Sequence, residues 1–206
     1  MNKKISAFIE SEVIPLESFL LSNEFSTLVE RLENLREAVK KKGWWTPYLP
    51  KNDGGMGLSL TQFAKISEIL GKSPLGHYVF NCQAPDIGNI ELLRGHGSPD
   101  QKSTFLEPLV AGNIRSCFAM TEPGKPGSNP TWMDTTANLD DNEYIINGRK
   151  WFTSAADGAS FCIVMAVTDS KSNDKYGRAS MFIVTSDNPG YEIVRNISVM
   201  GDTGEG

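Results

Sequence analysis

The sequence RSCFAMTEPGKPGS, residues 115–128, divides the chain into two parts of different character. Its first residues, up to Met120, predict a short strand. The prolines and glycines that follow predict an open loop, in which glycine lets a ligand approach the backbone closely. A second stretch, YIINGRKWFTS at residues 144–154, predicts strands on both sides of an Asn147-Gly148 turn, the second carrying Trp151 and Thr153.

Upstream of this boundary the patterns are helical. Apolar residues recur at helical spacing over residues 3–13 and 25–41, and Pro15 is expected to end or kink the first helix. Ser59 and Ser98 each open a capping box, which signals a helix start. A further helix is predicted over residues 85–94. We therefore expect residues 1–113 to form an all-helical N-terminal domain.

Downstream of the boundary the patterns are those of strands. Short β-rich runs occur at residues 115–120, 135–139, 144–146, 149–153, 161–168, 179–184 and 192–197. Strands and turns at this spacing predict an antiparallel β-barrel or sandwich over residues 114–206. The expected fold class is therefore α+β, with a helical domain followed by a β domain.

Composition excludes several classes of protein. The 206 residues are 39% hydrophobic and 22% charged with a net charge of -5, which predicts a soluble globular protein without a nucleic-acid surface. The chain has no apolar run of about 18 residues and no apolar leader, so neither a transmembrane span nor secretion is expected. Three widely spaced cysteines predict reduced thiols in an intracellular protein.

Hydrolytic and metal sites are also not predicted. The only two histidines, His77 and His96, both precede the predicted sheet, and no nucleophile-elbow or zinc-protease motif occurs. The loop after Met120 offers hydroxyls on Thr121 and Ser128 and backbone N–H groups that can form an anion nest. With the aromatic Trp151, these groups suit a flat, phosphate-bearing cofactor such as a flavin. The residues alone equally allow a surface turn and a core tryptophan.

Two motifs decide between these interpretations by resemblance. The segments FAMTEPGKPGS at 118–128 and IINGRKWFTS at 145–154 resemble the FAD-dependent acyl-CoA dehydrogenase family. In the helical part, PKNDGGMG at 50–57 and EPLVAG at 107–112 are similar to its N-terminal domain. FNCQAPDIGN at 80–89 is similar to the branch of family members ten and eleven. The family's C-terminal helical bundle, which carries its catalytic glutamate, has no counterpart in these residues.

The resemblance implies roles for individual residues. Thr121 would bond the pyrimidine edge of FAD, Trp151 would pack on its ring system, and Thr153 would bond near its redox-active nitrogen. Ser128 would contact cofactor phosphate and acyl-CoA. The loop is one residue longer than the usual family form, and Asn129 stands where Asp is usual. The implied cofactor-binding residues are Phe118, Met120, Thr121, Gly127, Ser128, Trp151, Phe152 and Thr153.

The resemblance also implies an activity and partners. The activity would be α,β-dehydrogenation of an acyl-CoA thioester, with hydride passing to flavin N5 and electrons to an electron-transfer flavoprotein or similar acceptor. Alternatives are an acyl-CoA oxidase, or a non-catalytic flavin- or acyl-CoA-binding fragment, since no catalytic residue and no metal ligand is assigned here. The parent protein would be a homodimer or tetramer. It would be cytoplasmic in bacteria, and mitochondrial or peroxisomal in eukaryotes.

Overall fold

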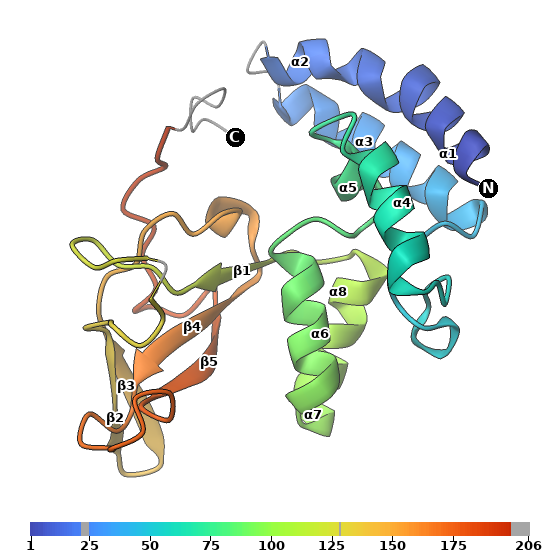
Figure 1. Ribbon diagram of the computed structural model, residues 1–206. Helices are drawn as coiled ribbons and strands as arrows, with labels where there is room; N and C mark the ends of the chain where they lie inside the picture. Colours follow the sequence, from blue (N-terminus) through green and yellow to red (C-terminus); the bar gives the residue numbers. More distant parts are fainter. Residues whose placement is uncertain (22–24, 128, 199–206) are drawn as a thin grey trace. The chain divides into compact units, whose positions relative to one another are not determined.

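The chain forms two compact units, shown in a computed structural model that describes residues 1–21, 25–127 and 129–198 (Figure 1). The helical unit ends at Gly112, and the sheet unit begins at Asn113. Among the described residues, no helix combines the length and the apolar character needed to cross a membrane.

The helical unit, coloured blue to green in Figure 1, is built from α-helices joined by short π- and 3-10 segments. The α-helices are α1 (Asn2–Phe8), α2 (Glu17–Leu21), α3 (Phe25–Lys41), α4 (Leu60–Leu70), α5 (Gly76–Val79), α6 (Asp86–His96), α7 (Pro99–Gln101) and α8 (Glu107–Ala111). The π-segments are Ile9–Val13 and Lys102–Leu106, and the 3-10 turns are Ile14–Leu16 and Lys51–Asp53.

Local sequence signals explain two of the helix starts. Ser59 and Ser98 both form the predicted capping boxes at the starts of α4 and α7. The sequence predicted that Pro15 would end or kink the first helix. The helix does not end there. Pro15 lies in the first turn of a 3-10 helix, where its missing N–H is not needed, so the chain continues into α2.

The core of the helical unit is formed by the predicted apolar faces. Ile5, Phe8, Ile9 and Val13 are all buried, as are Leu28, Leu32 and Val39 of α3. The aromatic rings of Phe8, Trp44 and Phe80 pack on one another with centroids 5.9–6.3 Å apart. These contacts bury the hydrophobic stripes that the helical spacing predicts.

The described residues of the sheet unit form five strands, which Figure 1 labels β1 to β5. They are β1 (Ser116–Ala119), β2 (Thr136–Asp140), β3 (Glu143–Asn147), β4 (Phe161–Val167) and β5 (Ala179–Thr185), with a 3-10 turn at Ala156–Gly158. The order is β1-β4-β2-β3, and β5 pairs with β4. The helical-then-sheet α+β fold is confirmed.

The sheet differs in detail from the expected antiparallel barrel or sandwich. Over the described part of the chain it is open, and β4 runs parallel to both β1 and β2. The β2–β3 and β4–β5 pairs are antiparallel. The long connection from Ala119 to Phe161, which includes the β2–β3 hairpin, returns the chain to the end from which β1 starts. A crossover of this length permits parallel pairing.

The predicted turn at Asn147-Gly148 is wrong. The β2–β3 hairpin turns at Asp141, whose φ of 51° is left-handed. Gly148 is required for another reason, because a Cβ there would lie 2.2 Å from Thr135 Oγ1. Residues 149–153 consequently form no strand, and residues 192–197, also predicted as a strand, carry none.

Candidate functional site

Two hydrogen bonds join the glycine-rich loop to the segment after β3. The N–H of Trp151 donates to the carbonyl oxygen of Thr121 at 3.1 Å. The hydroxyl of Thr121 donates in turn to the carbonyl oxygen of Trp151 at 2.6 Å. These two hydrogen bonds hold the loop and the segment after β3 side by side. Because its proton is used in this contact, Thr121 Oγ1 can offer a ligand only its lone pairs.

An aromatic pair stands exposed beside this junction. The side chains of Trp151 and Phe152 are 36% and 54% exposed, and their ring centroids lie 5.0 Å apart at an interplanar angle of 58°. Phe152 adopts a left-handed φ of 50°, which is unusual for a bulky residue. Residues in such conformations concentrate at functional sites. Trp151 is thus not the core aromatic that its sequence equally allowed.

A buried ion pair lies directly behind the junction. Lys150 Nζ donates to Glu122 Oε1 at 2.8 Å and to the carbonyl oxygen of Met120 at 2.9 Å. The two side chains are only 10% and 6% exposed. Glu122 also accepts the backbone N–H groups of Asp134 and Thr135, at 2.5 and 2.9 Å.

These contacts keep Glu122 ionised. Burial by itself would raise the pKa of its carboxyl group. The N–H of Asp134, the ammonium of Lys150 and the N–H of Thr135 outweigh burial and lower the pKa of Glu122 to about 2. The Glu122 carboxylate therefore stays charged at any ordinary pH. This carboxylate accepts the hydrogen bonds that a buried charge requires.

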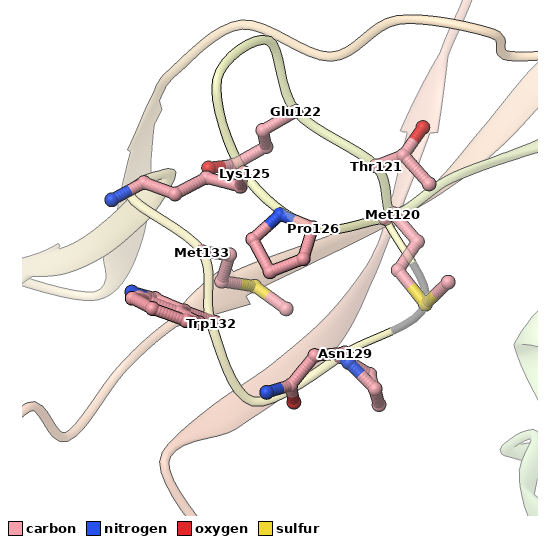
Figure 2. A pocket seen from close by; sticks show the side chains of 10 residues that line it. Met120, Thr121, Glu122, Lys125, Pro126, Asn129, Trp132 and Met133 are labelled. Atoms are coloured by element: carbon pink, nitrogen blue, oxygen red, sulfur yellow. The ribbon is translucent and has the colours of Figure 1, made fainter.

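The loop itself encloses a small pocket, which Figure 2 shows from close by. Its empty space of about 190 Å³ includes open solvent, so it is a small hollow that can be only part of a ligand site. It is lined by Met120, Thr121, Glu122, Lys125, Pro126, Gly127, Asn129, Pro130, Trp132 and Met133.

The expected anion nest is partly occupied by the loop's own turns. Gly124 has the left-handed φ of 77° that an open turn needs. However, the N–H of Lys125 donates to the Glu122 carbonyl, and that of Asn129 donates to the Pro126 carbonyl. Lys125 Nζ, 2.9 Å from Asp134, is the positive group of this loop.

Most of the predicted site residues come together. Met120, Thr121 and Gly127 line the pocket, and Trp151 and Phe152 follow Lys150 across the Thr121 junction. Phe118 is half-buried in β1, and Thr153 is half-buried with its carbonyl accepting the N–H of Ala156. Ser128 lies outside the described residues.

Sequence reasoning missed Glu122 and Lys150. Both lie inside the two motifs, but charged residues in loops usually face water, and nothing in the pattern pairs residues 28 positions apart. The usable signal was their position, since each stands directly beside a predicted site residue, Thr121 or Trp151.

Sequence profiles of one family match both units. The profile described as acyl-CoA dehydrogenase, N-terminal domain, matches residues 1–113, and the one described as acyl-CoA dehydrogenase, middle domain, matches residues 117–205. Together they account for nearly the whole chain. The chain belongs to the acyl-CoA dehydrogenase family.

Relatives place it near one branch of that family. Acyl-CoA dehydrogenase family member 11 of Homo sapiens is 38% identical over 212 residues, which cover 97% of this chain and 26% of the relative. Family member 10 of Mus musculus is 36% identical over 210 residues, covering 97% of this chain and 20% of the relative. The resemblance to the branch of members ten and eleven is confirmed. The chain spans about a quarter of the length of these relatives.

Solved structures of this family have a similar fold. A protein from Mycobacterium abscessus described as an acyl-CoA dehydrogenase matches with a TM-score of 0.89 at 36% identity, covering 99% of this chain and 54% of that one. An acyl-CoA dehydrogenase from Geobacillus kaustophilus matches with a TM-score of 0.73 at 24% identity, covering 96% and 50%. The second likeness concerns the fold alone.

Proposed function

We propose that the sheet unit binds FAD on the surface made by Thr121, Trp151 and Phe152. The observation that carries the proposal is the exposed aromatic pair, with Trp151 36% and Phe152 54% exposed and Phe152 in a left-handed conformation. A flat, apolar cofactor ring would cover this surface and offset the cost of exposing it.

The residues of the site suit the parts of that cofactor. Trp151 offers a stacking face, and Thr121 offers an acceptor to an N–H on the edge of a flavin ring. Met120 and Phe118 supply apolar contacts, while Thr153 adds a hydroxyl farther along the same segment. Gly127 and Ser128 would lie toward phosphate, where the loop's positive group is Lys125. The bound flavin would accept a hydride, as it does in other flavin enzymes.

The reaction proposed for the protein is α,β-dehydrogenation of an acyl-CoA thioester. Family membership supports it. The described residues assign no base for the α-proton, so this chain's contribution is to bind and orient. Acyl-CoA would be the substrate, with Ser128 among its contacts, and an electron-transfer flavoprotein or similar acceptor would receive the electrons. A homodimer or tetramer is proposed, cytoplasmic in a bacterium and mitochondrial or peroxisomal in a eukaryote.

Two other functions remain in competition. An acyl-CoA oxidase would use the same flavin surface, and rapid reaction of the reduced protein with oxygen would identify it. A non-catalytic protein that binds flavin or acyl-CoA fits the lack of an assigned base. Turnover of a panel of acyl-CoAs with an artificial electron acceptor would exclude that alternative.

A titration tests the cofactor assignment directly. Increasing protein is added to a fixed amount of FAD, and flavin fluorescence is followed until it saturates. We expect saturable quenching for the wild type and clearly weaker binding for Trp151→Ala. Tyr176→Ala is the matched control, because Tyr176 is a 73% exposed aromatic of the same unit outside the site. A folded protein that binds no FAD would overturn the proposal.

A further inference from the structure

We infer that the buried Glu122–Lys150 ion pair is the positioning device of this site, holding Thr121 against Trp151. The inference rests on the proposed function for its ligand, but not for its geometry. Neither residue would contact the flavin ring, although Glu122 also borders the loop pocket. Their role would be to fix the two segments that do.

Lys150 bonds the residues on either side of Thr121 in the sequence. Its Nζ bonds the carbonyl of Met120 at 2.9 Å and the carboxylate of Glu122 at 2.8 Å, and these are the residues directly before and after Thr121. Lys150 also directly precedes Trp151. The ammonium bonds and the two Thr121–Trp151 bonds are therefore neighbouring cross-links between the same two segments.

Glu122 connects these cross-links between the two segments to the sheet. Its carboxylate accepts the N–H groups of Asp134 and Thr135, and the Thr135 carbonyl accepts the N–H of Val167 in β4 at 2.8 Å. A continuous set of bonds thus runs from β4 through Thr135 and Glu122 to Lys150, the residue directly before Trp151. Residues 149–153 belong to no strand, so these side-chain bonds replace the support that a ladder would give.

The chemistry of the pair suits this role better than an apolar pair would. A lysine ammonium has three donors and can serve a carbonyl and a carboxylate at once, while a carboxylate can accept several N–H groups. Apolar residues of similar volume often match a buried ion pair in stability, but they would make none of these bonds. The competing explanation is a purely structural pair, whose loss lowers the stability of the whole unit without altering the site in the folded protein.

Hydrogen exchange separates the two explanations without any cofactor. The variants are Glu122→Gln, which keeps the side chain's shape, and Lys150→Met, with Lys150→Arg as the conservative replacement. We expect exchange of the Trp151 amide to rise at least about tenfold in the first two, while the β4–β5 ladder stays protected, and to recover partly in Lys150→Arg. Lys171→Met is the matched control, because Lys171 is an exposed lysine of the same unit that lies outside the site.

FAD titration then tests the consequence for binding. We expect Glu122→Gln and Lys150→Met to weaken FAD binding by about tenfold or more, and the control Lys171→Met to leave it within about twofold of the wild type. Unchanged protection of the Trp151 amide in Glu122→Gln, or uniform loss across the sheet, would overturn the inference. If Lys150→Met does not fold, Glu122→Gln and Lys150→Arg decide it. A wild-type protein that binds no FAD but shows the local exchange response would refute the flavin assignment and leave the positioning role standing.

Discussion

Each unit of this protein buries a charged centre, and the two centres do different work. In the helical unit, Arg36 is 1% exposed, and its guanidinium lies 4.8 Å from the Trp45 ring centroid and 4.5 Å from that of Tyr78. It donates to the carbonyls of Tyr78 at 2.8 Å and Gly112 at 3.1 Å. All these partners are parts of the helical core, so Arg36 ties α3, α5 and the end of α8 together.

In the sheet unit, the Glu122–Lys150 pair also makes several hydrogen bonds to the backbone, but the residues that it positions are exposed. Its partners lead to Thr121 and Trp151, which face solvent rather than a core. The difference shows that burial of a charge does not by itself indicate a functional site. What matters is whether the residues that the buried charge positions lie in the core or are exposed to solvent. Arg36 is expected to affect stability alone, and Glu122–Lys150 to affect stability and binding.

The largest expected effect is that of Arg36→Met. The replacement removes two hydrogen bonds to carbonyls, two ring contacts and the ion pair with Glu33 at 3.2 Å, and should cost about 3–5 kcal/mol of unfolding free energy. Urea denaturation would measure it, with Glu37→Gln as control, because the Glu37–Lys40 pair is largely exposed and its loss should leave the denaturation midpoint nearly unchanged. If the folded Arg36→Met protein bound FAD more weakly, the expectation that Arg36 affects stability alone would be wrong.

Acid should act on the sheet unit through Glu122. A carboxyl group whose pKa is lowered on folding contributes stability above its unfolded pKa, and this contribution is lost as pH falls through the folded value. With an ordinary pKa of 4.5 and a folded pKa of about 2, the loss falls between these two values. It should amount to about 3 kcal/mol.

The measurement compares melting temperatures from pH 5 to about pH 2. Glu122→Gln cannot titrate at this position, so it should be less stable than the wild type near neutrality and lose less as the pH falls. Parallel curves for the two proteins would show that Glu122 has no special protection.

Sequence patterns predicted the helical unit more closely than the sheet. Helix boundaries depend on local signals, and the capping boxes at Ser59 and Ser98 satisfy their own backbone N–H groups within one turn. Strand pairing depends on distant partners. The Asn147-Gly148 signal was misread because Gly148 makes room for Thr135, a contact between segments that no local pattern reveals.

The candidate site was predictable in its residues but not in its support. Motif resemblance marked Thr121 and Trp151, and the structure joins them through two hydrogen bonds. The exposure of Trp151 could not be inferred, since an aromatic residue fits a core and a ligand surface equally well. Glu122 and Lys150 were missed because a buried ion pair looks in sequence like any two charged loop residues.

Trp151→Ala should affect binding more than folding. Removing the stacking face should weaken FAD binding by about 1.5 kcal/mol or more, roughly tenfold. The melting temperature should change by only a few degrees, because the side chain is 36% exposed. A large fall in melting temperature with unchanged FAD affinity would make Trp151 a core residue like the rings around Arg36.

Thr121→Val should give the smallest effect, and it tests how the junction is used. Valine keeps the shape but removes the hydroxyl, which donates to the Trp151 carbonyl at 2.6 Å and can accept from a ligand. The site is exposed, so water can replace the lost donor to Trp151, and the stability change should stay below about 1 kcal/mol. Loss of the acceptor should weaken FAD binding by about 1 kcal/mol, roughly fivefold.

Thr121→Ser is the control for this change, because it keeps the hydroxyl and should bind FAD within about twofold of the wild type. If valine and serine behave alike, the hydroxyl does not contact the cofactor. The role of Thr121 would then be confined to its backbone bond with Trp151, which both variants retain. In that case Glu122 and Lys150 would act on the site only by placing the aromatic pair.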